Sequence, residues 1–310
     1  MTGRELPTLI RAASYPAGST ERRRLERRAR DGGLVPVRHG VFVATDAWGR
    51  LDADQQYLLR VRAAALKVEP RHVASHASAL AVHGLTSLHA WPRAVHLTDP
   101  DGGRGQSRTG LVKHAGPLDE TEIESIDGIR VTSPMRTCLD LAVTAPFEIT
   151  VASVDQYLRS ERISHGQLMA AFERSPIDRG RALAERALRF ANDLSDSAGE
   201  SWCRCILHDL GAPTPIQQKE FRDARGRIAF VDLWFESCGV IVEFDGDQKY
   251  FQPRFAKGRT VSEIIVDERK RERRLLALPE VRDVVRVEWK NLLQPWQLRV
   301  MATDAGIPLG

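Results

Sequence analysis

Apolar and polar side chains alternate most clearly in one segment near the C-terminus. Val231, Leu233 and Phe235 alternate with polar or larger residues, a period of two that predicts a half-buried strand. Cys238-Gly239 then offers a turn, because glycine adopts a positive φ without steric cost. The run from Val240 to Asp245 is apolar enough to be a central strand. This segment therefore predicts a β-hairpin.

The register expected for this hairpin brings three carboxylates together. A two-residue turn pairs Ser237 with Val240 and therefore Asp232 with Asp245. Directly opposed residues share a face of a sheet, as do residues two apart, so Asp232, Glu243 and Asp245 crowd one face. Opposed like charges destabilise a sheet, and a divalent cation would relieve the repulsion. Oxygen-rich sites of this kind suit Mg²⁺ or Mn²⁺.

The N-terminal residues 1–50 show the pattern of two helices followed by a tight hairpin. Residues 5–13 predict a short helix, and Ser19 or Thr20 caps a second helix that runs to about Arg30. Residues 34–43 predict the hairpin. This order of elements is that of a winged helix-turn-helix domain.

The second of these helices is rich in arginine. Residues 1–50 contain ten arginines against five acidic residues, and a basic second helix of this kind fits the major groove of DNA. The candidate nucleic-acid contacts are Arg22, Arg23, Arg24, Arg27, Arg28 and Arg38. The alternative is a solvated helix face, because charge runs are common on helix surfaces.

Residues 51–145 predict a mixed α/β domain. An apolar-periodic helix is expected from His72 to Gly84, where the glycine ends it. The other expected elements are strands at residues 95–97, 110–114 and 129–132, a flexible loop over residues 101–108, and a helix beginning at Ser133-Pro134. Six histidines lack the spacing of a metal motif, and we interpret them as structural or polar surface residues: His72, His76, His83, His89, His96 and His114.

Residues 146–194 predict helices throughout, which we interpret as a helical connector to a last domain over residues 195–310. That domain opens with a helix from about Ser197 to Leu210. Glu200 in its first turn either positions a metal or water or complements the helix dipole. Residues 254–274 carry eight basic residues against four acidic ones, which suits a phosphate backbone or a solvated helix. The candidate contacts there are Lys257, Arg259, Lys270 and Arg271.

The composition limits the classes of protein to which this chain can belong. The chain has 310 residues, of which 42% are hydrophobic and 28% charged, ordinary values for a soluble chain of two or three domains. We find no apolar run of membrane-spanning length and no signal-peptide core. The four scattered cysteines are expected to be reduced thiols of a cytoplasmic protein. The net charge of +4 suits a nucleic-acid partner.

The C-terminal motifs resemble the PD-(D/E)XK nuclease core over about residues 195–295. The closest resemblance is to the very-short-patch-repair-like endonuclease domains at the C-termini of many actinobacterial proteins. The matching motifs are Glu200, Val231-Asp232-Leu233, Glu243-Phe244-Asp245-Gly246 with Lys249-Tyr250, the helix from Glu268 to Leu276, and Val285-Arg286-Val287-Glu288-Trp289.

This resemblance implies metal-dependent phosphodiester hydrolysis. Asp232 and Glu243 would bind Mg²⁺ or Mn²⁺, and Lys249 would polarise the attacking water or the phosphate. Glu200 would orient water. Asp245 stands where the simplest form of the motif has its lysine, and Lys249 comes four residues later. The domain is therefore either a nuclease with a migrated lysine or a relative that does not cut.

A second resemblance, over about residues 5–145, is to the AbiEi-type antitoxins of type IV toxin–antitoxin systems. Its motifs are Arg38-His39-Gly40-Val41-Phe42-Val43, residues 75–85 and residues 131–142. It implies an N-terminal winged helix that binds DNA and an α/β domain for regulation or neutralisation. It also implies a separate cognate toxin, a nucleotidyltransferase, as a potential partner.

The expected fold class is α/β, as an α+β multidomain chain. The leading functional prediction is a protein that binds double-stranded DNA and carries a Mg²⁺-dependent endonuclease domain. One alternative is an antitoxin or transcriptional regulator whose nuclease-like domain does not cut. Another is a metal-free structural module, since a fold does not fix a function. No membrane association is expected, and no oligomeric state is predicted.

Overall fold

The computed structural model describes residues 6–102, 104–246 and 261–310, apart from the side chains of residues 261, 262, 264 and 265. The chain forms two compact units. The first comprises Met1–Ala145 and Gly166–Ala184, and the second comprises Pro146–His165 and Glu185–Gly310. The segment expected as one helical connector, residues 146–194, is thus divided between the two units.

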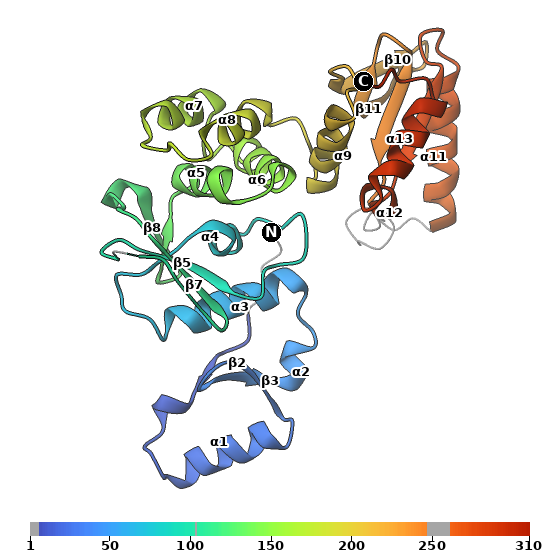
Figure 1. Ribbon diagram of the computed structural model, residues 1–310. Helices are drawn as coiled ribbons and strands as arrows, with labels where there is room; N and C mark the ends of the chain where they lie inside the picture. The colour runs from blue at the N-terminus through green and yellow to red at the C-terminus, as the bar shows by residue number, and fades with distance from the viewer. Residues whose placement is uncertain (1–5, 103, 247–260) are drawn as a thin grey trace. The chain divides into compact units, whose positions relative to one another are not determined.

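The first unit begins with a small antiparallel sheet in the order β1-β3-β2 (Figure 1). Its elements are β1 (Ile10–Arg11), η1 (Ala12–Ser14), α1 (Thr20–Arg30), β2 (Leu34–Arg38), β3 (Val41–Ala44) and the short α2 (Thr45–Trp48). Ser19 caps α1 by accepting a hydrogen bond from the backbone N–H of Arg22 at 3.1 Å. Leu25, the buried residue of α1, packs against Ala12 and Leu34.

The arginine-rich helix and the hairpin are confirmed, but the helix expected over residues 5–13 is wrong. Ile10 and Arg11 instead pair with Phe42 and Val41 as an edge strand. Backbone pairing with β3 outweighs the weak helical pattern of this short segment, because isolated short helices are marginal. The described part of residues 1–50 therefore places one α-helix, and not two, before the hairpin.

A six-stranded sheet in the order β6-β7-β5-β4-β9-β8 forms the centre of the first unit. Its strands are β4 (Val73–Ala74), β5 (Val95–Asp99), β6 (Gln106–Arg108), β7 (Leu111–Ala115), β8 (Ile123–Ile126) and β9 (Ile129–Thr132). Its helices are α3 (Ala53–Ala65), α4 (His76–Val82), η2 (Glu120–Glu122) and α5 (Pro134–Thr144). The core contains Tyr57, Val61, Leu97 and Val131.

Two expectations for this region are corrected. The helix expected from His72 begins only at His76, because Val73 and Ala74 are taken into the sheet between β5 and β9. The loop expected over residues 101–108 contains an edge strand, β6, which pairs with β7. Both corrections arise from tertiary strand pairing, which a local pattern does not contain.

Three histidines meet beside this sheet, although their sequence spacing suggested no cluster. The rings of His76 and His114 stack with centroids 3.7 Å apart, and His96 Nδ1 lies 3.0 Å from His114 Nε2. His76 is buried and has a φ of +53°. Burial, followed by the charges of His114, His96 and Arg136, lowers the pKa of His76 to about 2. His76 is therefore neutral in the folded protein at neutral pH.

This histidine should make the protein less stable in acid. In the unfolded chain the pKa of His76 is about 6.5, so below this pH the unfolded chain binds a proton that the folded protein does not bind. The free energy of unfolding therefore falls by about 1.4 kcal/mol for each unit by which the pH is lowered. His76→Asn should flatten this slope, since asparagine tolerates a positive φ. The measurement is urea unfolding of both proteins from neutral pH to pH about 4.5. Burial raises the pKa of Asp140 to about 6, an opposing effect, so the difference between the two proteins isolates His76. Parallel curves would contradict the assignment.

The helices α6 (Phe147–Arg159), α7 (His165–Arg174) and α8 (Arg181–Phe190) follow α5. They agree with the helices expected within residues 146–194, although residues 175–180 between α7 and α8 are not helical. In the second unit, α6 packs against α9 (Ala198–Asp209), which Ser197 caps by accepting from the Glu200 N–H.

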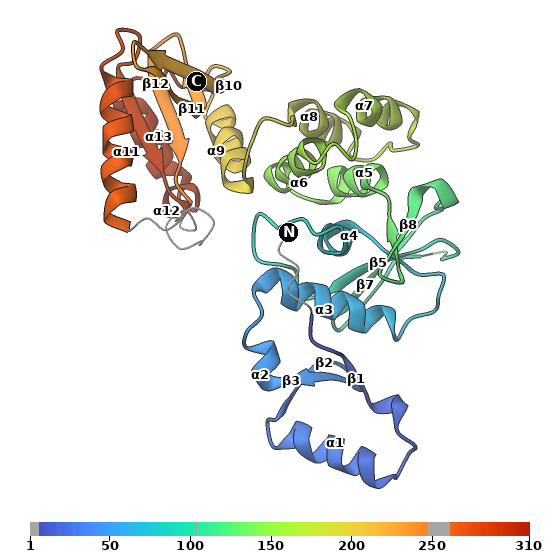
Figure 2. The ribbon, with the colours of Figure 1, turned by 180° about the vertical axis from the view of Figure 1, so that it is seen from behind.

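The second unit contains a four-stranded mixed sheet in the order β10-β11-β12-β13 (Figure 2). Its elements are β10 (Ile216–Asp223), β11 (Gly226–Phe235), β12 (Val240–Phe244), α11 (Val261–Leu276), β13 (Asp283–Val287), α12 (Trp289–Leu292) and α13 (Pro295–Asp304). The first three strands are antiparallel, and β13 lies parallel to β12. Helices α9 and α11 lie on opposite sides of this sheet (Figure 1).

The described helices include no segment long and apolar enough to span a membrane. All four cysteines are free thiols.

Helix α9 approaches the sheet closely where the end of β12 carries Phe244. A Cβ placed on Gly199 would lie 2.1 Å from the Phe244 ring, which packs edge-on against Trp289. Gly199→Ala should therefore destabilise the protein by about 2 kcal/mol, the usual cost of overpacking. Gly166→Ala on α7 is the matched control, because open space surrounds it. The control should be neutral or stabilise by up to about 1 kcal/mol. Chemical denaturation measures both, and equal stabilities would contradict this packing.

Candidate functional site

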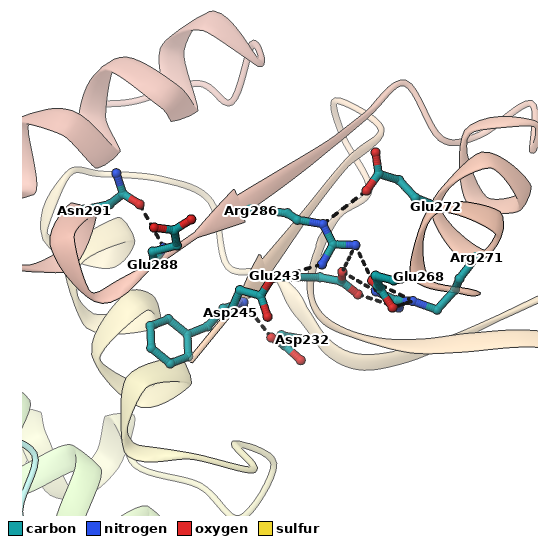
Figure 3. Close-up of polar contacts among 10 residues, drawn as sticks. Asp232, Glu243, Asp245, Glu268, Arg271, Glu272, Arg286, Glu288 and Asn291 are labelled. Carbon is teal, nitrogen blue, oxygen red and sulfur yellow. Dashed lines mark hydrogen bonds and ion pairs between the residues drawn. The ribbon is translucent and has the colours of Figure 1, made fainter. Parts of the chain in front are cut away.

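The predicted hairpin exists, but its register differs from the expectation. Phe235 pairs with Val240 and Leu233 with Val242, so the connection spans four residues and not two. This register, continued outwards, sets Asp232 opposite Glu243, whereas the expected partner was Asp245. The shift is two residues, which preserves the alternation of faces along the two strands, and the observed pairing ends at Leu233 and Val242, one residue before Asp232 and Glu243. Figure 3 shows Asp232, Glu243 and Asp245 at the same end of the hairpin.

Arginines neutralise the central carboxylate of this group. Arg271 on α11 donates from Nη1 and Nη2 to the two oxygens of Glu243, at 2.8 and 2.6 Å. Arg286, the neighbour of Glu243 on β13, lies 3.4 Å from Glu243 and 3.6 Å from Asp245. The Glu243 side chain is only 6% exposed. A forked guanidinium on a carboxylate is among the strongest protein ion pairs.

Further acids from α11 extend this group into an arginine–carboxylate cluster, which we define as Asp245, Glu243, Glu268, Arg271, Glu272 and Arg286 (Figure 3). Glu268 pairs with both arginines, and Glu272 accepts from Arg286 Nε at 3.1 Å. Burial alone would lower the pKa of Arg271, but Glu243 and Glu268 raise it above its usual value. Burial alone would raise the pKa of Glu268, but Arg271 and Arg286 lower it. The ion pairs therefore favour the charged forms of Glu268 and Arg271, and the cluster contains four acidic side chains to two arginines.

The Glu243 oxygens that a metal ion would use are hydrogen-bonded to an arginine. Both of its carboxylate oxygens accept from Arg271, so a cation bound there would share these oxygens with the guanidinium or displace it. Among the described residues, we find no group of three histidine, cysteine or acidic side chains arranged to hold a metal. Asp232 is oriented by a hydrogen bond from the Phe244 N–H to its Oδ2 at 2.8 Å.

Glu200 lies at the start of α9, and its carboxylate caps that turn. It accepts from the Asp196 N–H at 2.7 Å and from Ser197 Oγ at 2.9 Å. Its own N–H donates back to Ser197 Oγ. Of the two interpretations of Glu200, this geometry matches the carboxylate that stabilises the N-terminus of a helix.

Several predicted contacts are placed differently from the expectation or lie outside the described residues. Arg271, expected to contact DNA, points inward to Glu243 and Glu268. Lys270 remains on the surface beside Asp267. Lys249, Lys257 and Arg259 lie outside the described residues.

Sequence reasoning missed Arg286, Glu268 and Glu272 as members of the cluster. Arg286 interrupts the apolar strand β13, and a charge inside a buried strand signals a partner on the same face. The partner could not be assigned without knowing that β13 lies parallel to β12 with Arg286 beside Glu243.

The predicted DNA-contacting arginines of α1 lie largely on its exposed side. Arg22 pairs with Glu26 at 3.2 Å. Arg23, Arg24, Arg27 and Arg28 are exposed and have no ion pair within the part of the chain that the structure describes.

One family model matches the middle of the chain. The family described as AbiEi antitoxin C-terminal domain matches residues 72–188. The match starts after the arginine-rich helix and extends into α8, whereas the sequence resemblance was placed at residues 5–145. The AbiEi-type part of the prediction is therefore supported, over a range further along the chain.

Two curated relatives come from Mycobacterium tuberculosis: uncharacterized protein MT2308 of strain CDC 1551 / Oshkosh and uncharacterized protein Rv2248 of strain ATCC 25618 / H37Rv. Each is 27% identical over 265 residues, which cover 81% of this chain and 92% of the relative. The crystal structure of the RV2827C protein from Mycobacterium tuberculosis matches with a TM-score of 0.37 and 12% identity. That match covers 71% of this chain and 85% of the other. A likeness this weak supports no inference about function.

Proposed function

We propose that this protein is a DNA-binding regulator of the AbiEi antitoxin type, whose C-terminal sheet domain does not catalyse phosphodiester cleavage. The observation that carries this proposal is the match of residues 72–188 to the AbiEi antitoxin C-terminal domain. The proposal places DNA binding in α1 and the following hairpin. It places contact with a separate toxin, expected to be a nucleotidyltransferase, in the antitoxin-like domain.

The exposed charge of α1 supports DNA binding. Leu25 holds one side of the helix on its sheet, so Arg23, Arg24, Arg27 and Arg28 remain available to phosphates or base edges. Arginines that neutralise phosphates release counterions, which makes affinity fall steeply with salt.

The test is binding of the protein to duplex DNA from its own upstream region, measured by fluorescence anisotropy over a range of salt. Arg23→Ala/Arg27→Ala should weaken binding about tenfold or more and reduce the salt slope by about 2. Arg179→Ala, an exposed arginine in the same unit, is the control and should bind like the wild type. If wild-type affinity is independent of salt, or the variant binds equally well, the DNA-binding proposal fails.

The arginine–carboxylate cluster supports a C-terminal domain without catalysis. In a nuclease the carboxylates would serve a cation, but here Arg271 occupies both oxygens of Glu243. Co-expression with a nucleotidyltransferase from the same genomic neighbourhood tests the toxin part. Growth rescue by the wild type, and by a variant lacking the C-terminal cluster charges, would support neutralisation without cleavage.

A nuclease is the second candidate, favoured by one observation: Asp232, Glu243 and Asp245 lie at the same end of a hairpin in a mixed sheet. The test is cleavage of supercoiled and single-stranded DNA with Mg²⁺ or Mn²⁺. Asp232→Asn is the informative variant, because it keeps an oxygen for the Phe244 N–H but loses the charge. Metal-dependent cutting that this variant abolishes would favour the nuclease. Binding by the wild type without cutting would favour the regulator.

A further inference from the structure

Four basic side chains from three parts of the first unit surround one cavity. Arg38 comes from β2, Lys67 follows α3, and Arg108 and Lys113 come from the hairpin β6–β7. The cavity has a volume of about 350 Å³. Gln106 and Thr109 add polar groups to its lining. The family match names a domain and no ligand, so it assigns no role to these four basic side chains.

Strand pairing explains why the hairpin presents its charges together. Gln106 lies opposite Lys113 in the β6–β7 register, and Arg108 lies two residues from Gln106. Opposed residues and residues two apart share a face of a sheet, so Gln106, Arg108 and Lys113 point to the same side.

The turn between β2 and β3 approaches the same place through Gly40. A Cβ on Gly40 would lie 3.4 Å from Lys67 Nζ, so the turn after β2 passes directly beside this ammonium group. Arg38 precedes that turn and is half-buried, and burial lowers its pKa. A larger residue at position 40 would be strained in any case, because φ is +70°.

These positive charges lack compensation within the described residues. No ion pair or hydrogen bond there involves the side chains of Arg38, Lys67, Arg108 and Lys113. The single acid in the lining, Glu69, is paired with Arg71 at 2.8 Å. Like charges gathered around a cavity repel one another, and an anion relieves that repulsion.

We propose that this cavity, lined by Arg38, Lys67, Arg108 and Lys113, binds a phosphate group. The inference builds on the proposed DNA binding, and the favoured source is a phosphodiester of DNA held by α1. Arg38 lies on β2, the strand whose Leu34 packs against Leu25 of α1, so the basic helix and the cavity belong to one folded unit. Arginine forks match the geometry of phosphate oxygens, and lysines add point charge. A free phosphate-bearing molecule has the same recognition chemistry.

The experiment compares wild type, Arg108→Ala/Lys113→Ala and Arg179→Glu, which removes the same net charge at an exposed site outside the cavity. Thermal unfolding first verifies that all three fold. Binding to a short duplex is measured over a range of salt, and binding of inorganic pyrophosphate is measured by calorimetry without DNA. Arg108→Ala/Lys113→Ala should bind DNA about tenfold more weakly than the wild type. Its slope of log affinity against log salt concentration should be shallower by about 1 to 2, while Arg179→Glu keeps the wild-type affinity and slope.

The outcomes distinguish a DNA phosphodiester from a free phosphate-bearing ligand, and they distinguish failure of the phosphate site from failure of the proposed DNA binding. A reduced slope for the cavity variant alone supports a DNA phosphodiester. Unchanged DNA binding together with loss of pyrophosphate binding supports the phosphate site with a free ligand. If the wild type does not bind DNA but binds pyrophosphate through these residues, DNA binding fails and the phosphate site stands. If both readouts are the same in wild type and variant, the phosphate site is overturned.

Discussion

Replacing Glu243 by alanine should destabilise the protein by about 2–4 kcal/mol. The substitution removes the most buried carboxylate partner of Arg271 and Arg286, and breaking one side of a buried ion pair costs several kcal/mol. The expected loss is moderated because Glu268 still pairs with both arginines, whose side chains are 22% and 26% exposed. Urea unfolding followed by tryptophan fluorescence measures the loss.

The sign of this effect distinguishes two accounts of the carboxylates. If Asp232, Glu243 and Asp245 mainly repelled one another while awaiting a cation, removing Glu243 would stabilise the metal-free protein. If Glu243 is the counterion of Arg271 and Arg286, removing it destabilises. Glu236→Ala, an exposed acid in the connection between the same strands, is the control and should change stability by less than about 0.5 kcal/mol.

A double variant tests the pair directly. Glu243→Gln/Arg271→Gln removes both charges and should recover part of the stability that Glu243→Gln alone loses, because no uncompensated charge remains on Arg271. Additive losses in the two single variants would mean that the two side chains are not coupled.

Replacing Asp155 by alanine should be more damaging, with a loss of about 3–5 kcal/mol. Asp155 on α6 is 1% exposed and accepts from Arg204 Nη2 at 2.8 Å, and Arg204 itself is 5% exposed. Asp155 also accepts from Ser201 Oγ at 2.7 Å and from the Asn192 N–H at 2.8 Å. One carboxylate thus joins α6, α9 and the chain after α8, all within the second unit.

The loss is large because Arg204 cannot reach solvent. Its guanidinium lies 4.2 Å from the centre of the Phe190 ring and donates to the Phe190 carbonyl at 2.8 Å, so without Asp155 its charge stays buried. Asp155→Leu/Arg204→Met should be much less destabilised than Asp155→Ala, since both charges leave together. Glu185→Ala breaks an exposed ion pair with Arg189 and is the control, with an expected loss below about 1 kcal/mol. Equal losses for Asp155→Ala and Glu185→Ala, in thermal or urea unfolding, would contradict this role of Asp155.

The sequence by itself predicted the elements whose signals are local. Ser19 and Ser197 mark helix starts because their side chains accept from the backbone of the first turn. The period-two pattern of Val231 to Phe235 identified β11, and the apolar run from Val240 identified β12. Since side chains alternate with a period of two, an error of two residues in register does not change which residues of the two strands point to the same side.

Only the tertiary structure decided what those carboxylates face. The pairing of Arg286 with Glu243 depends on a parallel neighbour 43 positions along the chain, and Arg271 reaches Glu243 only when α11 packs on the sheet. The same holds for the meeting of His76, His96 and His114, for the edge strand at Ile10, and for the four cations around one cavity. Residue type and spacing determine propensity and alternation, which are local properties. The partner that compensates a buried charge, or the absence of one, depends on contacts between distant segments, and these exist only in the folded chain.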